Sequence, residues 1–348
     1  MVHRGHEVIG VAPDGDDEVR LGLARIGVSF RELNLRRAGL DPLADARSIR
    51  ELVRLFRQER PELVFAYTIK PAIYASLAGR IAGIKRRAVM ITGLGYTFTE
   101  RGGLRQRIAR LVAIQLFRRA LTNDQTIFFQ NPDDRNEFAS MGLIPKGAGV
   151  EIVRGSGVDP QLYARSPMPA GPMRFLFVGR LLRSKGVYEY VEAARATRAR
   201  DPSVIFDVVG WIDANPESVQ RAELDAWVRD GVITYSGAVA DVRPYLRAAH
   251  VLVLPSYREG TPRSVLEAMS VGRAVITTDA PGCRETIADG ESGRLVPVKN
   301  AVALAEAMQE LMNDRSKLER FAANGRARVE QLYDDRVVAA RMLDVMHL

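Results

Sequence analysis

The sequence predicts an α/β protein made of two doubly wound domains with mainly parallel sheets. Short apolar or β-branched runs alternate with amphipathic segments of about 10 to 20 residues along the whole chain. The length of 348 residues is about twice that of a common domain. The segment 154–172 breaks the alternation once, with three glycines and four prolines. We therefore expect an N-terminal domain over 1–160, a linker over 161–172, a C-terminal domain over 173–330, and a C-terminal helix over 331–348 that crosses back to the N-terminal domain.

The apolar runs give the expected strands in order. They are 8–12, 63–67, 88–91 and 126–129 in the first half, then 175–178, 205–209, 233–235, 251–254, 274–277 and 295–298. Only residues 1–7, of which 3–6 resemble the tail of a helix, come before the first of these strands. The N-terminal domain is therefore expected to lack its first strand and the glycine loop after it, and we interpret this as a mistaken start codon or a fragment.

Composition excludes several protein classes. Hydrophobic residues make up 47% and charged residues 26%, which is typical of a globular protein and not of a disordered or collagen-like one. The longest apolar stretches, such as 111–117, are far shorter than the roughly 20 residues of a membrane-spanning helix. Cys283 is the only cysteine, which excludes an internal disulfide, and no secretory signal is visible. A cytoplasmic location is expected.

The positive charge is concentrated in the first half. Residues 1–165 hold 26 Lys and Arg against 18 Asp and Glu, and the rest holds 24 of each. This asymmetry favours contact with phosphates, nucleic acid or anionic lipid, although an arginine-rich composition alone would also produce it. A predicted helix over 101–119 combines an apolar stripe with six arginines, a pattern of membrane-surface helices. The alternative is a core-facing stripe with solvated arginines.

The strongest local motif is the segment 255–269. The strand 251–254 leads into a polar loop, and Pro262 suits the first turn of a helix that runs to about Val271. Backbone N–H groups near Thr261 and over 263–265 would be available to a phosphate or a sugar hydroxyl. Glu259 on the loop and Glu267 in the helix can reach different parts of one elongated ligand. Taken alone, Glu259 would be a surface loop acid and Glu267 an early-helix acid favoured by the helix dipole.

Glycines and cations follow other strands of the second half. After 175–178 come Gly179, Arg180 and Lys185, and the two cations offer a planar fork and a point charge to a diphosphate. The segment 279–285, with Gly282, is expected to open a short helix, and Gly237 follows the strand 233–235. Gly237 could also be a simple turn.

In the first half, two loops after strands are expected to bring their backbone close to a phosphate. The first contains Thr68 and Lys70, and the second contains Gly93 and Gly95. Phe98 stands where the third glycine of a dinucleotide fingerprint would be, which argues against NAD. A purely structural role for these residues stays open.

The segment 255–269 resembles the Glu-x7-Glu signature of glycosyltransferase family 4, retaining enzymes of the GT-B architecture in which two Rossmann-like domains face each other across a cleft. The resemblance implies that Glu259 contacts the donor sugar, that Glu267 holds the ribose hydroxyls, and that Arg180 and Lys185 bind the diphosphate. Glu259, Arg180 and Lys185 are thus the expected catalytic residues. The remaining donor-binding residues would be Gly260, Thr261, Pro262, Gly179, Gly237 and Gly282.

The loops 67–71 and 91–96 resemble the branch of that family that extends polyprenyl-diphosphate-linked sugars. This implies an acceptor site at Thr68, Lys70, Gly93 and Gly95. The expected function is retaining transfer from a nucleotide-diphosphate sugar, with UDP favoured, to a lipid-diphosphate-linked saccharide in surface polysaccharide or lipopolysaccharide biosynthesis. The alternatives are a nucleotide-sugar epimerase of similar fold and a non-catalytic nucleotide-sugar-binding protein.

No metal or other cofactor is expected. The four histidines are scattered, and no Asp-x-Asp motif lies on the loops expected to bind the nucleotide. The expected partners are the nucleotide sugar, the lipid-linked saccharide and an anionic membrane surface, without nucleic acid. These partners place the protein on the cytoplasmic face of the cell membrane as a peripheral protein.

Overall fold

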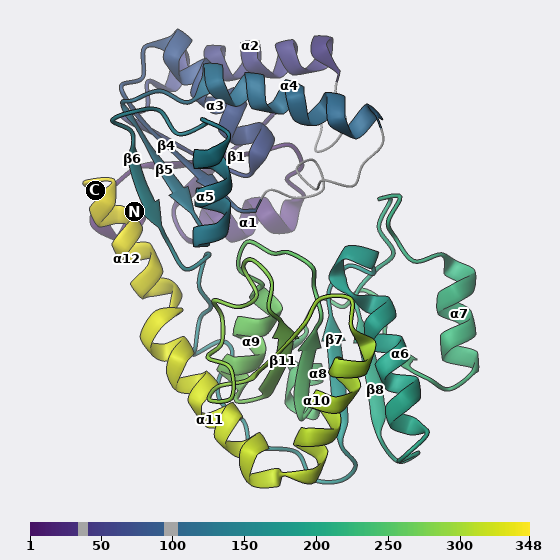
Figure 1. Cartoon of the computed structure of the whole chain (residues 1–348). Helices are drawn as coiled ribbons and strands as arrows, with labels where there is room; N and C mark the ends of the chain where they lie inside the picture. Colours follow the sequence, from purple (N-terminus) through teal and green to yellow (C-terminus); the bar gives the residue numbers. More distant parts are fainter. Residues whose placement is uncertain (34–40, 94–103) are drawn as a thin grey trace. The chain divides into compact units, whose positions relative to one another are not determined.

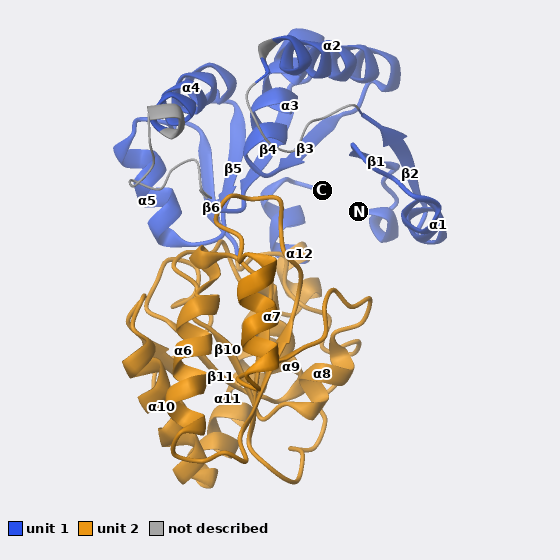
Figure 2. Ribbon diagram, turned by 90° about the vertical axis from the view of Figure 1, so that its right-hand side faces the viewer, with its two compact units in different colours: residues 1–153, 340–348 blue, residues 154–339 orange. Residues whose placement is uncertain are grey.

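The chain forms two compact α/β units, seen here in a computed structural model that describes residues 1–33, 41–93 and 104–348. Unit 1 comprises residues 1–153 and 340–348, and unit 2 comprises residues 154–339 (Figures 1 and 2). All strand pairs between named strands are parallel in the described part of the chain, as the alternating pattern predicted. Within that part, no helix is both long enough and apolar enough to cross a bilayer.

Unit 1 contains two separate sheets. One is the pair β1 (Val8–Ala12) and β2 (Val28–Glu32), and the other is four-stranded in the order β3 (Leu63–Tyr67), β4 (Arg86–Ile91), β5 (Gln125–Phe129) and β6 (Gly149–Ile152). Figure 2 shows β1 and β2 apart from the other strands. The strands β2 and β6 were not predicted from the sequence. In β2, apolar residues alternate with polar or charged ones, and β6 is mostly exposed. Neither strand contains the apolar run that marks a buried strand.

The helices of unit 1 begin at residues that cap them. Asp16, Asp41 and Asn131 each accept a hydrogen bond from the backbone N–H three residues later. The helical elements are η1 (Val2–Arg4), α1 (Asp17–Arg25), α2 (Pro42–Glu59), α3 (Ile69–Ala82), α4 (Leu104–Ala120) and α5 (Pro132–Ser140). The core of this unit lies around β3 to β5 and α3, whereas no residue of β1 is buried.

Unit 2 has one six-stranded sheet. Its order is β12 (Arg294–Val296), β11 (Ala274–Thr278), β10 (Val251–Leu254), β7 (Arg174–Val178), β8 (Ile205–Val209) and β9 (Thr234–Tyr235). The other elements are η3 (Arg183–Lys185), α6 (Val187–Arg198), α7 (Arg221–Arg229), α8 (Arg243–Ala248), α9 (Arg263–Val271), α10 (Ala301–Asn313), α11 (Arg315–Leu332) and α12 (Asp335–Val345). The chain leaves β7 toward β8 and later returns to β10 on the other side of β7. This is the switch point at which doubly wound sheets bind ligands.

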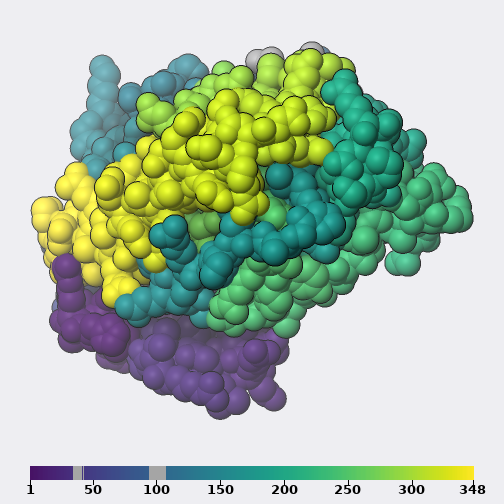
Figure 3. All heavy atoms as spheres, turned by 90° about the horizontal axis from the view of Figure 1, so that it is seen from below, coloured from purple at the N-terminus to yellow at the C-terminus, as the bar shows by residue number. Residues whose placement is uncertain are grey.

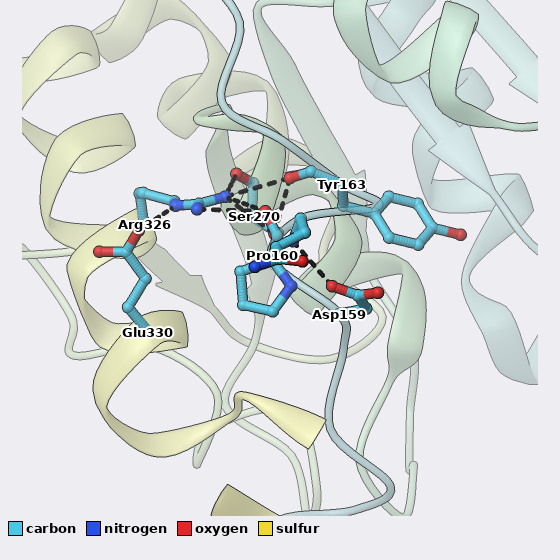
Figure 4. A network of polar contacts seen from close by, with 7 residues as sticks. Asp159, Pro160, Tyr163, Ser270, Arg326 and Glu330 are labelled. Carbon is cyan, nitrogen blue, oxygen red and sulfur yellow. Dashed lines mark hydrogen bonds and ion pairs between the residues drawn. The ribbon is translucent and has the colours of Figure 1, made fainter. Parts of the chain in front are cut away.

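The segment expected as a linker, 161–172, instead packs on unit 2, which begins at Arg154 and not after residue 160. The Arg326 guanidinium donates to the carbonyls of Pro160 and Tyr163, at 3.2 and 3.1 Å, and to that of Ser270, at 2.5 Å (Figure 4). Arg273, fully buried, donates to the carbonyl of Pro167 at 2.8 Å. Because a buried guanidinium needs acceptors, these two arginines fix the glycine- and proline-rich segment.

The end of the chain belongs to unit 1 from Ala340 onward. There Arg341 pairs with Glu151 of β6 at 2.7 Å, and Arg86 donates to the carbonyl of Met346 at 2.5 Å. The expected helix 331–348 is in fact divided between the end of α11 and α12, because Tyr333 ends α11.

Candidate active site

Two loops leave the strands that flank the switch point of unit 2. The loop 179–186 follows β7, and the loop 255–262 follows β10. Both strands are almost entirely buried, so their carboxyl ends are held by the core and the loops start from fixed points. The strongest candidates predicted from the sequence, Glu259 and Lys185, lie on these two loops.

Lys185 and Glu259 meet at this switch point. The Lys185 ammonium donates a hydrogen bond to Glu259 Oε1, and the two side chains are 19% and 12% exposed. An ammonium has three N–H donors, so the bond to Glu259 leaves Lys185 able to bind further oxygens. The pair joins a cation suited to phosphate and a carboxylate suited to sugar hydroxyls on neighbouring strand ends.

Two glycines that leave no room for a side chain, Gly186 and Gly282, hold three loops close together. The loops are 179–186, 255–262 and 279–285. A Cβ on Gly186 would lie 2.1 Å from the carbonyl oxygen of Pro255, and a Cβ on Gly282 would lie 2.2 Å from that of Glu259. Both glycines have positive φ, of 73° and 80°. The Glu259 N–H also donates to the Pro281 carbonyl at 2.9 Å. The backbone position of Glu259 is therefore set from both neighbouring loops.

Arg180 lies apart from the Lys185–Glu259 pair. Its side chain is 44% exposed, and its guanidinium donates to Asp213 at 3.1 Å, in the loop after β8. An exposed pair of this kind contributes little stability, so the guanidinium can exchange Asp213 for another anion at small cost. Gly179 lies at the start of the same loop, and its carbonyl oxygen would be 1.8 Å from a Cβ on Gly210. Gly237 accepts from the Gly210 N–H at 2.9 Å, so these strand ends pack closely.

Glu267 lies in α9, in a partly closed environment. Its side chain is 11% exposed, and its nearest charge is Arg263, one turn earlier at 3.5 Å. Burial raises the pKa of the Glu267 carboxyl, against the opposing effects of Arg263 and of a hydrogen bond from the Tyr163 hydroxyl. The pKa of Tyr163 is raised to about 12, first by burial and then by Glu267. Of the backbone groups expected to be available, the Val265 N–H is used by the Pro262 carbonyl.

The segment 279–285 consists of a bend followed by turns, so the expectation of a short helix there is wrong. Gly282 has a left-handed backbone that interrupts a helix, and its N–H donates to the Glu285 carboxylate at 2.8 Å. Cys283 is fully buried, and burial raises the pKa of its thiol to about 12. This residue is therefore a packed, unreactive thiol.

The expected acceptor residues of unit 1 lie at the ends of β3 and β4. Thr68 has a left-handed φ of 69°, rare for a non-glycine residue, and its N–H donates to the Met90 carbonyl. Lys70 pairs with Asp45 of α2 at 3.3 Å. Gly93 is partly exposed with a φ of 122°, and Gly95 lies outside the described residues. Thr68 and Gly93 follow neighbouring strands of one sheet, so their loops leave the same edge of it. The Lys70 ammonium is instead occupied by Asp45 of α2.

Two residues near the candidate loops of unit 2 were not predicted from the sequence. Asp213, the partner of Arg180, follows strand 205–209 and would have been found by inspecting every loop after a strand. Tyr163, which bonds Glu267, lies in the segment interpreted as a linker and gave no signal. Over the residues that the structure describes, no group of three His, Cys, Asp or Glu side chains is placed to hold a metal ion.

Two family models match the chain. Residues 172–314 match the model described as glycosyl transferases group 1, and residues 1–150 match the glycosyl transferase 4-like domain. Together they cover most of both units. The chain belongs to glycosyltransferase family 4. The conclusion agrees with the resemblance of the 255–269 motif and with the doubly wound units.

Two relatives that match this chain over most of its length are named as glycosyltransferases. An N,N'-diacetylbacillosaminyl-diphospho-undecaprenol alpha-1,3-N-acetylgalactosaminyltransferase of Campylobacter jejuni is 27% identical, covering 98% of this chain and 90% of that protein. The capsular polysaccharide biosynthesis glycosyltransferase CapM of Staphylococcus aureus is 23% identical over 85% of this chain and 79% of its own.

Solved structures show the same fold. A glycosyltransferase of Rickettsia africae superposes with a TM-score of 0.79 at 15% identity, covering 99% of this chain and 90% of that one. HepE of Anabaena in complex with UDP-glucose gives 0.76 at 19% identity, with coverage of 96% and 90%. The family 4 enzyme described here therefore has the GT-B architecture.

Proposed function

We propose that this glycosyltransferase moves a sugar, with retention of configuration, from a UDP-sugar to a saccharide linked to a lipid diphosphate in surface polysaccharide assembly. The observation that carries the proposal is the Lys185–Glu259 pair at the switch point of unit 2. A cation and a sugar-binding carboxylate on adjacent strand ends suit a ligand with phosphate next to sugar. The name of the Campylobacter relative and the UDP-glucose bound by HepE support the acceptor and the donor nucleotide.

The proposed step exchanges one bond at the anomeric carbon. The acceptor hydroxyl oxygen forms a bond to that carbon as the bond to the diphosphate oxygen breaks on the same face, and the hydroxyl proton passes to the leaving diphosphate. Lys185 and Arg180 stabilise the negative charge that grows on the diphosphate. Glu259 orients the donor sugar, Glu267 accepts from the ribose hydroxyls, and the first turn of α9 offers backbone N–H groups. These roles need no metal ion, because the two cations supply the positive charge.

The donor contacts assigned to Gly260, Thr261, Pro262, Gly179, Gly237 and Gly282 are part of the same proposal. All of these residues follow β7, β9, β10 or β11, whose carboxyl ends share one edge of the sheet. In unit 1, we assign the acceptor diphosphate to the backbone around Thr68 and Gly93. Lys70 contributes once its pair with Asp45 opens.

We also propose that α4 rests on an anionic membrane surface. Phe117 and Ala120 turn one side of this helix to the core, yet Ile108, Leu111 and Val112 are 49%, 62% and 37% exposed. Exposed Arg107, Arg118 and Arg119 lie on the same helix. An apolar row with flanking arginines is typical of a helix that lies in the lipid interface, where lipid-linked acceptors are found. The enzyme would then be peripheral on the cytoplasmic face.

The test is transfer from defined UDP-sugars to undecaprenyl-diphosphate saccharides, followed by mass spectrometry and NMR of the product. The expected product is one hexose or N-acetylhexosamine heavier, with the anomeric configuration of the donor, and it forms in excess chelator. Inversion, or conversion of the UDP-sugar to its epimer without use of the acceptor, would contradict the proposal. Activity lost in chelator and restored by a divalent cation would contradict metal independence alone.

A further inference from the structure

The further inference concerns Tyr163, in the segment 154–172 that packs on unit 2. Its ring is partly buried against the core of this unit, and its carbonyl accepts from the Ser270 hydroxyl of α9 at 2.8 Å. A few residues later, the Ser166 N–H donates to the Val271 carbonyl at 3.0 Å. The segment therefore follows the last turn of α9 and is bonded to it at two places.

The backbone at Tyr163 is also fixed by Arg326 of α11. This guanidinium donates to the Tyr163 carbonyl at 3.1 Å and to the Pro160 carbonyl at 3.2 Å, and Glu330 pairs with its Nε at 2.7 Å (Figure 4). In the space-filling view, teal residues of this part of the chain border the yellow residues of α11 (Figure 3). The Tyr163 N–H donates to the Asp159 carbonyl at 3.0 Å. The main chain of Tyr163 is thus held from α9, from α11 and from its own turn.

The Tyr163 side chain reaches Glu267, which lies three residues before Ser270 on α9. Positions three apart on a helix share a face and lie about 4.5 Å apart along the axis. The Tyr163 hydroxyl donates to the Glu267 carboxylate, while the carbonyl of the same tyrosine accepts from Ser270. Because its main chain is held, Tyr163 presents its hydroxyl to the carboxylate from a fixed place.

Glu267 lies where a carboxylate needs a donor. Its side chain is 11% exposed, whereas its nearest cation, Arg263, is 63% exposed at 3.5 Å, so water screens that charge. On the helices packed against α9, the Arg326 guanidinium is bound to carbonyls, and Arg243 of α8 acts on the Tyr163 hydroxyl. Burial raises the pKa of the Glu267 carboxyl, and the bond from Tyr163 opposes this effect by favouring the ionised form.

We propose that Tyr163 is the positioning residue of Glu267 and holds its carboxylate in the orientation that a ribose hydroxyl of the donor requires. This inference rests on the role of Glu267 in the proposed function. A carboxylate accepts at about four positions, so the bond from Tyr163 leaves others for the ribose. The ionised carboxylate also accepts more strongly than the neutral acid. The segment 154–172 then takes part in donor binding without touching the donor.

Tyr163→Phe tests this role, because it removes the hydroxyl and keeps the packed ring. UDP binding is measured by calorimetric titration at pH 6 and pH 8, each time as a ratio to the wild type, since the phosphate of UDP itself titrates near about pH 6. The variant should bind about threefold more weakly at pH 8 and about tenfold more weakly at pH 6, where its carboxyl takes up a proton more readily. A ratio that does not grow toward low pH would overturn the proposal.

Tyr188→Phe is the matched control. The Tyr188 hydroxyl donates to Glu223 at 2.9 Å, so this variant also removes a bond between a tyrosine and a glutamate of unit 2. It should bind UDP like the wild type at both pH values. Equal losses in the two variants would overturn the proposal, because they would show that any such bond affects binding through the stability of the unit.

A double-mutant cycle shows whether Tyr163 acts through Glu267. In a Glu267→Ala background, Tyr163→Phe should change the UDP affinity by less than about twofold, because no carboxylate is left to position. An equal loss with and without the carboxylate would overturn the proposal, since Tyr163 would then act on the nucleotide by another route.

A measurement without nucleotide separates this inference from the proposed function. The carboxyl carbon of Glu267, assigned in protein labelled with carbon-13 glutamate by its absence from Glu267→Gln, should titrate at a higher pH in Tyr163→Phe than in the wild type. An unchanged titration would overturn the positioning role alone. A Glu267→Ala variant that binds UDP like the wild type would instead refute the ribose contact of the proposed function, and this inference with it.

Discussion

Lys185 and Glu259 form a hydrogen-bonded ion pair although they are 74 residues apart in the sequence. Each follows one of the two strands that flank the switch point, so the topology of the sheet brings them together. The side chains are 19% and 12% exposed, which reduces the screening of their charges by water. The proposed donor site is thus built around a pre-formed pair of opposite charges, and this arrangement can be tested directly.

Lys185→Ala is expected to lower kcat about 100- to 1,000-fold, because the growing charge on the diphosphate loses its nearest ammonium. Lys185→Arg should restore only part of the rate, since a planar fork replaces a point charge. Lys317, which pairs with Glu310 at 2.7 Å, provides the matched control, and Lys317→Ala should leave kcat within about twofold. Steady-state kinetics with the UDP-sugar measure all three, and equal losses at Lys185 and Lys317 would refute the role.

Glu267→Gln is expected to weaken UDP binding about 10- to 100-fold, because a neutral amide accepts the ribose hydroxyls less strongly than a carboxylate. The pKa of Glu267 is raised by burial, so the wild-type affinity should fall as the pH drops through this raised value. The folded protein holds the proton more tightly than the unfolded chain. The ionised form therefore reduces stability at neutral pH, and the variant should unfold at an equal or higher temperature.

Calorimetric titration of UDP from pH 5 to 8, together with thermal unfolding, checks the Glu267 prediction. Glu330→Gln is the control, since Glu330 also pairs with an arginine one turn away, Arg326, but on α11. A variant of Glu267 that binds UDP normally and has lost stability would show that the glutamate is structural.

Gly186→Ala and Gly290→Ala separate backbone strain from close contact. Both glycines have a φ near 73°, but a Cβ on Gly186 would meet the Pro255 carbonyl, and a Cβ on Gly290 would meet nothing within 4 Å. Gly290→Ala should cost about 1 kcal/mol of unfolding free energy. Gly186→Ala should cost about 3 kcal/mol or more and displace the loop of Glu259, which lowers kcat. Urea unfolding and kinetics provide the measurement, and equal costs would contradict the contact argument.

Much of unit 2 could be predicted from the sequence because its central strands are buried on both faces. Val251–Leu254 and Ala274–Thr278 read as continuous apolar or β-branched runs, and the bounds of β9 and β12 differ from the expected ones by only one or two residues. The loops of Glu259 and Lys185 followed from these strands. Their direct pairing did not, because the order in which parallel strands lie side by side depends on long-range packing.

Other features had no local signal. The edge strand β6 is mostly exposed and has no apolar run. The segment 154–172 looks like a linker because glycine and proline favour irregular backbone, and only the distant Arg273 and Arg326 reveal that it is held in place. Left-handed Gly282, equally, could not be told from a glycine at the start of a helix.

His250 should make unit 2 sensitive to mild acid. Its Nδ1 accepts from the Arg174 N–H at 3.1 Å and its Nε2 lies 3.1 Å from the Pro169 carbonyl, so the neutral ring with a proton on Nε2 satisfies both. Burial lowers the pKa of His250, and nearby arginines lower it further. The unfolded chain therefore binds the proton more readily, and stability is lost as the pH falls below about 6.5 toward the lowered value.

Thermal unfolding between pH 7.5 and 5.5 checks the His250 prediction. The midpoint of the wild-type protein should fall over this interval, and His250→Gln should start lower but depend less on pH. Exposed His3 is the control, since His3→Gln should leave the pH dependence as it is. A His250→Gln curve parallel to that of the wild type would assign the acid sensitivity to another group.

The exposed apolar row of α4 predicts membrane binding that depends on both charge and apolar contact. Replacing Ile108 and Leu111 together by Asp should weaken binding to vesicles that contain phosphatidylglycerol by at least about tenfold, because two half-exposed side chains lose their burial in the interface. Arg118→Glu with Arg119→Glu should weaken it as well, and more at low salt than at high salt. Val302→Asp, at a 70% exposed position of α10, is the matched control and should bind like the wild type.

Co-sedimentation at two salt concentrations distinguishes these outcomes. Equal binding by all variants would show that α4 does not contact the membrane, and its exposed row would then need a different partner.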